Sequence, residues 1–201
     1  MGKGYLGIDE SNNGRYPEIF VGVYSENPED MVVNSEGLSK KRKSPKKLIN
    51  SILQEREFKY LVIDETYAGL FHIKDIGVLA AAELIRAFEN LETVIIDGEI
   101  RRAELKKLEE LVKKPVIILP EPKGDVKYPI VNAADNLAHI LYKYHSECKR
   151  KNNDGRDYED RLITPTIEEY KCLFLDQCDK KKNKKNRLMN KKNLALLTTS
   201  S

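Results

Sequence analysis

Short apolar runs alternate along the chain with longer segments in which apolar residues recur at helical spacing. The short runs are rich in β-branched residues and end in charged residues or turn formers, a pattern typical of strands. The second run, Glu18–Ser25, is expected to pair antiparallel with the first. The pattern predicts strands over Tyr5–Ile8, Glu18–Ser25, Met31–Asn34, Tyr60–Glu65, Thr93–Asp97 and Val116–Leu119.

The longer segments predict helices. One begins at Ser44, an N-cap residue, with Pro45 at the first helical position, and runs to about Glu57. The other predicted helices cover Ile76–Leu91, Glu99–Lys113, Pro129–His145 and a shorter piece near Thr166–Cys178. The inward-facing residues are expected to be Gly77, Ala80, Ala81, Leu84, Ala87, Phe88 and Leu91 in the Ile76 helix, and Ile130, Ala134, Leu137, Ala138 and Leu141 in the Pro129 helix.

A hairpin followed by alternating strands and helices predicts an α/β protein with a mixed sheet covered by helices. Sites in open α/β sheets form at the carboxyl ends of strands. Asp9 and Glu10 follow the first predicted strand, Asp97 ends another, and Asp125 follows the last. Hard cations such as Mg²⁺ take a few carboxylate ligands and keep water and substrate phosphate as the rest. The acids at the strand ends therefore predict a divalent-metal site.

The length of 201 residues is enough for one domain, alone or with an appendage, to bury a substantial core. No apolar run approaches the roughly 20 residues that a membrane span needs, and the N-terminus has no signal-peptide pattern. The three cysteines are odd in number and form no Cys-x-x-Cys, which argues against structural disulfides. These features predict a cytoplasmic, intracellular protein with no membrane association.

Charge is concentrated at the C-terminus. Residues 180–201 hold eight lysines and arginines and no acid, so with a net charge of +3 for the whole chain the preceding residues carry −5. A basic, disordered tail of this kind has two interpretations: it adds non-specific affinity for phosphates, or it only solubilises the protein.

Four segments follow one another along the chain in an order that resembles the motifs of a known family. They are Gly7-Ile8-Asp9-Glu10 followed by Gly14, then Leu38-Ser39-Lys40-Lys41, then Ile96-Asp97-Gly98, and finally Lys123-Gly124-Asp125 with Pro129 and Asn132-Ala133-Ala134. In this order they resemble the opening motif, the basic element before a helix, the third-carboxylate strand, and the Lys-Gly-Asp loop with its Ala-rich helix of type 2 ribonuclease H. The resemblance spans about residues 4–145.

The resemblance implies a ribonuclease H-like mixed sheet flanked by helices in a catalytic domain of residues 1–146, followed by an extension over 147–179 and the basic tail over 180–201. It implies that Asp9, Glu10, Asp97 and Asp125 are the catalytic ligands of Mg²⁺ or Mn²⁺. The implied activity is hydrolysis of the RNA strand, or of ribonucleotides, in RNA–DNA duplexes, with two ions about 4 Å apart clamping the attacking and leaving oxygens. No protein partner is evident. The expected nucleic-acid contacts are Asn12, Asn13, Gly14, Lys40, Lys41, Lys123 and Tyr158.

The turn Asn12-Asn13-Gly14 departs from the family's Gly-Arg-Gly, whose backbone reads a ribose 2′-hydroxyl. Close approach of backbone amides to that hydroxyl requires a turn without side-chain obstruction. Asn12 and Asn13 each add a side chain where the sugar would sit. We therefore predict poor recognition of a lone ribonucleotide compared with a continuous hybrid.

The segment Ala134-Asp135-Asn136-Leu137-Ala138 instead resembles the last-carboxylate helix of type 1 ribonuclease H and of Holliday-junction resolvases. Asp135 lies at the edge of the predicted apolar stripe, so it is either a ligand or a flanking residue. Glu65, at the end of its predicted strand, would complete that alternative ligand set. Two further functions thus stay open: a structure-selective DNA nuclease or resolvase of the same fold, and a non-catalytic nucleic-acid-binding protein. The intact set of four acids counts against the non-catalytic protein.

Overall fold

The computed structural model describes residues 3–11, 17–38, 50, 52, 56–63, 73–146 and 158–163. All of them belong to one compact unit that spans residues 1–164. Its strands are β1 (Gly4–Ser11), β2 (Glu18–Ser25), β3 (Glu57–Ile63), β4 (Leu91–Asp97) and β5 (Ile117–Glu121). Its helices are η1 (Pro28–Met31), α3 (Ile73–Arg86), α4 (Arg102–Val112), α5 (Gly124–Lys127), α6 (Pro129–Ser146) and η3 (Glu159–Arg161).

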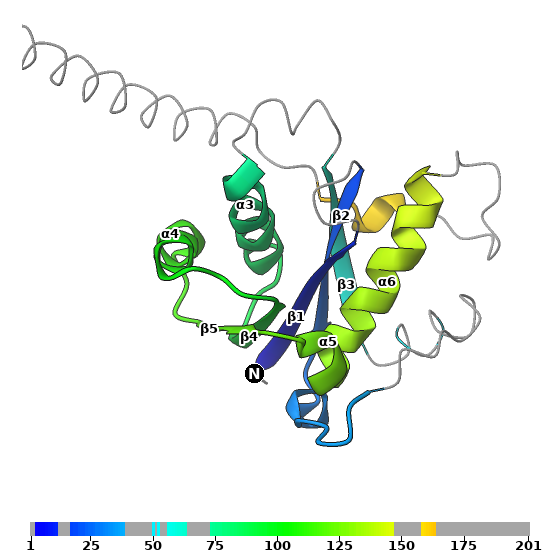
Figure 1. The fold of residues 1–201 in the computed structure, drawn as a ribbon, viewed down its shortest axis with the longest axis horizontal. Coiled ribbons are helices and arrows are strands. Elements are labelled where there is room, and N and C mark those ends of the chain that lie inside the picture. The colour runs from blue at the N-terminus through cyan, green and yellow to red at the C-terminus, as the bar shows by residue number, and fades with distance from the viewer. Residues whose placement is uncertain are drawn as a thin grey trace, which may run out of the picture. The chain divides into compact units, whose positions relative to one another are not determined.

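The strands form one five-stranded sheet in the order β3-β2-β1-β4-β5. β1, β2 and β3 pair antiparallel, as expected for the hairpin, whereas β4 runs parallel to β1 and β5 parallel to β4. Helices α3 and α4 lie on one side of the sheet and α6 on the other (Figure 1). The predicted mixed α/β sheet covered by helices is therefore confirmed.

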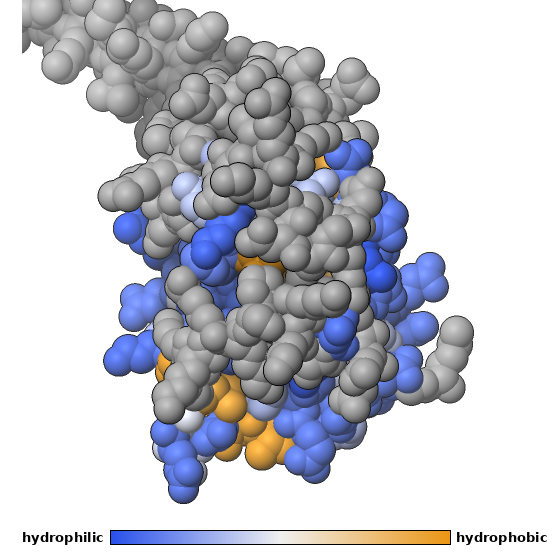
Figure 2. Space-filling view, turned by 90° about the vertical axis from the view of Figure 1, so that its right-hand side faces the viewer, coloured by the Kyte–Doolittle hydropathy of each residue, from blue (hydrophilic) through white to orange (hydrophobic). Residues whose placement is uncertain are grey.

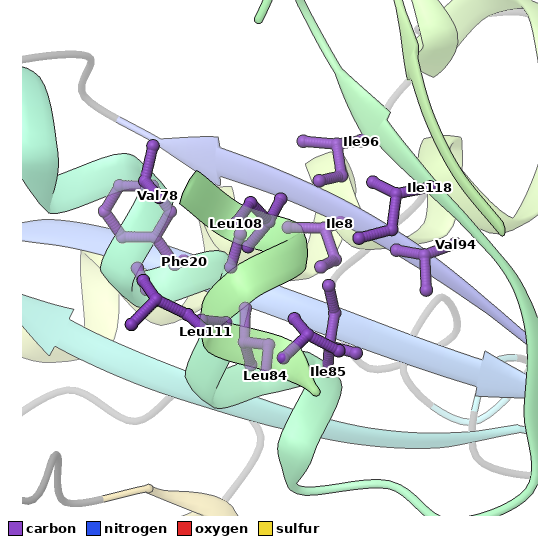
Figure 3. Close-up of a cluster of buried hydrophobic side chains, with 14 of the residues drawn as sticks. Ile8, Phe20, Val78, Leu84, Ile85, Val94, Ile96, Leu108, Leu111 and Ile118 are labelled. Atoms are coloured by element: carbon purple, nitrogen blue, oxygen red, sulfur yellow. The ribbon is translucent and has the colours of Figure 1, made fainter. Parts of the chain in front are cut away.

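One hydrophobic core fills the space between the sheet and helices α3 and α4. Successive strand residues face opposite sides of a sheet, and the even-numbered residues of β1 and β4 face this core. Figure 3 shows Ile8, Val94, Ile96 and Ile118 from three adjacent strands packed near Leu108 of α4. The side chains of α3 and α4 thus fix the positions of β1, β4 and β5 relative to one another.

A second core lies between the sheet and α6. It receives Val21 and Val23 from β2, Ile95 from β4, and the buried face of α6. Gly7 on β1 allows α6 to pack closely against the sheet. A Cβ at that position would lie 2.7 Å from the backbone carbonyl carbon of Ile130. The first turn of α6 therefore rests directly on β1, just before the acidic end of that strand.

The α6 side of the sheet is only partly covered, because α6 packs mainly on β1 and β2. On the outer strand β5, Ile117 and Leu119 face this side and are 57% and 44% exposed. Most of the residues coloured in Figure 2 are hydrophilic, and a small apolar patch lies toward the lower end of the view. Within the described part of the chain, no helix is both long enough and apolar enough to cross a bilayer.

The predicted strand Met31–Asn34 is wrong. Met31 ends the 3₁₀ helix η1, whose first turn is capped by the Asn27 side chain accepting a hydrogen bond from the backbone N–H of Glu29. Val32 and Val33 are each 54% exposed. Asn27 and Pro28 start a helical turn. The β-propensity of Val32 and Val33 does not produce a strand, because no strand of the described part of the chain pairs with them.

Several boundaries also differ from the prediction. Glu57, the expected end of the Ser44 helix, begins β3; Asn50 and Ile52 of that helix are helical, and most of its other residues lie outside the described ones. Helix α3 ends at Arg86 rather than Leu91, because Asn90 adopts a left-handed turn (φ 55°) that leads into β4. Gly77, expected to face inward, is exposed. The predicted helix near residues 166–178 lies outside the described residues.

Candidate carboxylate site at the strand ends

Strand pairing brings two of the predicted acids side by side. β1 and β4 run parallel with Gly7 opposite Ile95 and Ile8 opposite Ile96, so Asp9 follows opposite Asp97. The electrostatic influence of Asp97 on Asp9 agrees with this proximity. Asp9 is only 6% exposed although its strand ends two residues later. The carboxyl ends of β1 and β4 thus form the centre of the candidate site.

Alternation along β1 separates Asp9 from Glu10. Gly7 meets α6, so Asp9, two residues on, faces the α6 side, whereas Ile8 and Glu10 face the α3 side. Besides burial, which has the largest effect on Glu10, the charge of Glu18, the first residue of β2, acts on it, followed by the charge of Asp97. The two adjacent acids therefore reach the strand end from opposite sides of the sheet, as a regular strand requires.

Asp125 reaches the site through the short helix α5. Its backbone N–H donates to Asp97 Oδ1 at 3.2 Å, and its side chain is buried, with 7% exposure for the residue. Gly124 makes this approach possible, since a Cβ there would lie 3.3 Å from Asp97 Oδ1. Lys123 before it adopts the left-handed conformation (φ 61°) that turns the chain from β5 into α5.

Helix α6 contributes Asp135, the residue with two interpretations. Its charge acts on Asp9, which places the two carboxylates in the same electrostatic environment. Asp135 is half-buried. The described residues thus include a fifth acid whose charge acts on Asp9, whereas Glu65 of the alternative ligand set lies outside them.

Burial and like charge make this site unfavourable for ionised carboxylates. Burial raises the pKa of Asp9 to about 9, and the charges of Asp97, Asp135 and Glu10 add to the rise, while a hydrogen bond from the Glu10 backbone opposes it. That N–H donates to Asp9 Oδ1 at 2.7 Å. Burial likewise raises the pKa of Glu10 to about 7, together with the charges of Glu18 and Asp97. A bound cation would offset this repulsion.

The donor set fits a hard divalent cation that also takes ligands from its substrate. Among the described residues, no three or more histidine, cysteine, aspartate or glutamate side chains form a ready-made metal cluster. Mg²⁺ commonly binds through one or two carboxylates plus water and substrate phosphate, which matches the adjacent pair Asp9 and Asp97. Ser11 Oγ, two residues beyond Asp9 on the same side of β1, is the one buried side-chain polar atom of the described part that has no hydrogen-bond partner.

The expected nucleic-acid contacts have different surroundings. Lys123 is exposed beside Asp125. Tyr158 is 2% exposed and packs its ring against Phe58 and Tyr144, so it belongs to the core between the sheet and α6, and its ring offers no surface for nucleic acid. The other expected contacts, Asn12, Asn13, Gly14, Lys40 and Lys41, lie outside the described residues.

The segment that leads to Lys40 and Lys41 is nevertheless attached to the site. Asn34 N donates to Lys127 O at 2.8 Å, and Leu38 N donates to Val126 O at 2.7 Å. Both acceptors belong to α5, the helix that holds Asp125. In the sequence, Lys40 and Lys41 therefore follow shortly after a segment that is hydrogen-bonded to α5.

Sequence reasoning missed two features of the site. Glu18 begins the strand that pairs with β1, yet it is buried and acts on Glu10, a consequence of the hairpin register that no local motif reveals. Lys127 forms an ion pair with Glu121, whose register partner is Asp97. Lys127 follows Asp125 by two residues within the single turn of α5, so it stays near the end of β5. This spacing in the sequence could have signalled the ion pair.

The described residues form a mixed five-stranded sheet flanked by helices, with acids at the carboxyl ends of β1 and β4. Neither protein-family models nor curated proteins match the sequence. Solved structures do. A chain of the PCNA:ribonuclease HII complex from Archaeoglobus fulgidus matches with 22% identity and a TM-score of 0.57, covering 86% of this chain and 89% of that one. Ribonuclease H2 from Pyrococcus horikoshii matches with 15% identity and a TM-score of 0.57, over 76% and 78% of the two chains. The fold implied by the sequence resemblance is therefore confirmed.

Proposed function

We propose that this protein is a divalent-metal-dependent endonuclease of the ribonuclease H type that hydrolyses the RNA strand of RNA–DNA duplexes. The observation that carries the proposal is the meeting of three acids: Asp9 beside Asp97 at the ends of β1 and β4, and Asp125 of α5, whose backbone N–H donates to the Asp97 carboxylate. The fold is one that ribonucleases HII and H2 of archaea share. An acidic strand end in this fold supports a nuclease more specifically than either feature alone.

The catalytic ligands would be Asp9, Glu10, Asp97 and Asp125. Mg²⁺ or Mn²⁺ bound to them would supply positive charge for the attacking water and the leaving oxygen of the phosphodiester. Asp9 and Asp97 are adjacent on one side of the sheet, and Glu10 reaches the same end from the other side. Asp97 is oriented by the Asp125 backbone N–H. Hydrolysis adds water across one P–O bond and leaves a phosphomonoester and a hydroxyl end.

Lysines would hold the nucleic-acid backbone. Lys123 is exposed next to Asp125, which supports its contact with a phosphate near the reacting bond. Lys40 and Lys41 follow a segment that is hydrogen-bonded to α5, which supports the same role for them. We further propose that Asn12, Asn13 and Gly14 contact the duplex with little discrimination between ribose and deoxyribose. The setting we propose is intracellular.

A second candidate function rests on Asp135. Its charge acts on Asp9 from α6, which supports its use as a ligand in the manner of type 1 ribonucleases H and junction resolvases. A structure-selective DNA nuclease or resolvase with these ligands would act on branched DNA. The two functions differ in the ligand set, because the alternative requires Asp135 together with Glu65.

One cleavage assay tests both candidates. The purified protein is incubated in Mg²⁺ and in Mn²⁺ with matched duplexes that contain no ribonucleotide, one ribonucleotide or a continuous RNA strand, and with a four-way DNA junction. We expect cleavage of the continuous hybrid, slower cleavage at the single ribonucleotide, and no cleavage of the DNA duplex. Cleavage of the junction alone would replace the ribonuclease with the resolvase, and cleavage of none of the substrates would refute both.

A further inference from the structure

A chain of hydrogen bonds runs from the middle of α6 to the carboxylate of Asp97. The Asn136 side-chain amide donates to the Asn132 backbone carbonyl at 2.7 Å and to Asn132 Oδ1 at 3.2 Å. The Asn132 amide donates to the Asp125 carbonyl at 2.8 Å, and the Asp125 backbone N–H donates to Asp97 Oδ1 at 3.2 Å. Two asparagines thus connect α6 to a carboxylate on β4 through the backbone of one residue.

We propose that Asn132 and Asn136 are positioning residues of the carboxylate site. Asn132 holds the backbone of Asp125 through its carbonyl, so that the Asp125 N–H engages one oxygen of Asp97. The other oxygen of Asp97 is then left for a cation. Asn136 fixes which end of the Asn132 amide faces Asp125. This role rests on the function proposed above, since it concerns the geometry of that same site.

The amide orientation is the reason why both residues are needed. An asparagine side chain presents an acceptor at one end and two donors at the other. If the Asn132 amide were reversed, its oxygen would face the Asp125 carbonyl, and two acceptors would repel each other. The bond from Asn136 to Asn132 Oδ1 selects the productive orientation. Alanine or leucine would favour the helix more than asparagine does, so helix propensity does not explain the pair.

Helix α5 needs such support because it is short. It spans only Gly124–Lys127, and it begins from the left-handed Lys123. Few hydrogen bonds within four residues can hold its position, whereas α6 is anchored over 18 residues, with its first turn against Gly7 of β1. The asparagines transfer the position of α6 to Asp125. The position of Asp125 in turn orients Asp97.

The test is Mn²⁺ affinity measured by isothermal titration calorimetry on the full chain. Partners that orient metal ligands typically change metal affinity 10- to 100-fold. Because Asn132 acts through a backbone carbonyl, we expect Asn132→Ala to weaken Mn²⁺ binding by about 10-fold, at the lower end of that range. Asn136→Ala should weaken it less, Asn136→Gln should retain most of the affinity, and the double variant Asn132→Ala/Asn136→Ala should match Asn132→Ala alone. Additive losses would mean that the asparagines do not act in series.

Asn27→Ala is the control for lost stability. Asn27 caps η1 beyond Ser25, at the end of β2 opposite the acids. We expect its loss to lower the melting temperature without changing Mn²⁺ affinity. Equal affinity for Asn132→Ala and the unmodified protein would overturn the proposal.

A second readout separates this inference from the proposed function. Hydrogen exchange of the Asp125 amide, followed by NMR without metal, should accelerate in Asn132→Ala but not in Asn27→Ala. If the unmodified protein neither binds Mn²⁺ nor cleaves a duplex while this acceleration is seen, the proposed function fails and the positioning of Asp125 stands. An unchanged Asp125 exchange rate in Asn132→Ala would overturn the positioning itself.

Discussion

The site depends on single residues that are unfavourable for folding. Asp9 is a buried carboxyl group influenced by the charges of Asp97, Asp135 and Glu10, and Ser11 has a buried hydroxyl group with no hydrogen-bond partner among the described residues. Proteins retain such groups at functional sites, where a ligand or substrate relieves the cost. Each can therefore be replaced to separate stability from activity.

Asp9→Asn should abolish cleavage and raise stability. The pKa of Asp9 is raised from 3.8 to about 9 in the folded protein, so the folded state holds this proton more tightly than the unfolded state. The unmodified protein therefore loses stability as the pH rises from about 4 to about 9, whereas asparagine does not titrate. Thermal melts in EDTA should show a gain for Asp9→Asn that is larger at pH 8 than at pH 5. A gain that shrinks with rising pH would contradict the raised pKa, and full activity of the variant would refute the site.

Ser11→Ala should leave the free protein as stable as before or stabilise it by up to about 1 kcal/mol, because a buried polar group without a partner carries a desolvation cost. Ser25→Ala is the matched control. Ser25 Oγ accepts a hydrogen bond from the Asn27 N–H, so its removal should destabilise the protein by about 1 kcal/mol. Urea denaturation measures both changes. Ser11→Ala as destabilising as Ser25→Ala would mean that the Ser11 hydroxyl has a partner in solution.

The position of the acids depends on two close contacts with the sheet, one made by α6 and one made by α5. Gly7 brings α6 against β1, and Gly124 brings α5 against Asp97. A Cβ at Gly7 would require the backbone of α6 to move, whereas a Cβ at Gly124 would require the Asp97 side chain to shift by a few tenths of an ångström. Helix α6 carries Asp135 and α5 carries Asp125. The packing of these helices on the sheet therefore determines where the two carboxylates lie.

Gly7→Ala should therefore destabilise the protein by about 1–3 kcal/mol, the range expected for overpacking in a tight core. The added Cβ would lie 2.7 Å from the Ile130 backbone. Gly77→Ala provides the opposite control: Gly77 is an exposed residue of α3, where a Cβ meets only Phe20, at 4.0 Å, and alanine should stabilise the helix by about 0.5–1 kcal/mol. Equal effects of the two variants, measured by chemical denaturation, would contradict the proposed contact between α6 and β1.

The sequence predicts the centre of the site better than its surroundings. Asp9 and Asp97 end apolar runs, and a strand that ends in an acid is a local signal that needs no knowledge of the fold. Glu18 and the Asn132–Asn136 pair escape prediction because their roles depend on hairpin register and on the docking of α6 against α5. Tyr158 was assigned to the nucleic acid by resemblance, whereas its burial against Phe58 depends on a return of the chain to β3 that no local pattern indicates.

For the whole molecule, charge is divided between an acidic body and the basic residues 180–201. The body carries the carboxylate site, and a duplex that approaches it meets net negative charge. Eight positive charges on one segment would offset this repulsion by binding phosphates without sequence preference. The tail is then expected to affect binding and not the chemical step.

Deletion of residues 180–201 should weaken duplex binding at low salt and make the affinity less dependent on salt, because fewer counterions are released. The rate constant of bound substrate should not change. Fluorescence anisotropy between about 50 and 200 mM salt measures the slope, and single-turnover kinetics measure the chemical step. An equal loss of affinity at all salt concentrations would show that the tail acts through non-electrostatic contacts.

We propose that the acids at the ends of β1 and β4 catalyse hydrolysis of RNA in a hybrid. The single-turnover rate of cleavage of a uniform RNA–DNA hybrid in Mg²⁺, compared between the unmodified protein and Asp97→Asn, tests this role. Asp97 lies opposite Asp9 in the strand pair and accepts a hydrogen bond from the Asp125 N–H. Asp97→Asn therefore keeps the shape of this side chain and removes only its negative charge. We expect Mg²⁺-dependent cleavage that EDTA abolishes and that Asp97→Asn reduces by at least about 100-fold. Cleavage by Asp97→Asn at the unmodified rate, or cleavage that persists in EDTA, would contradict the account.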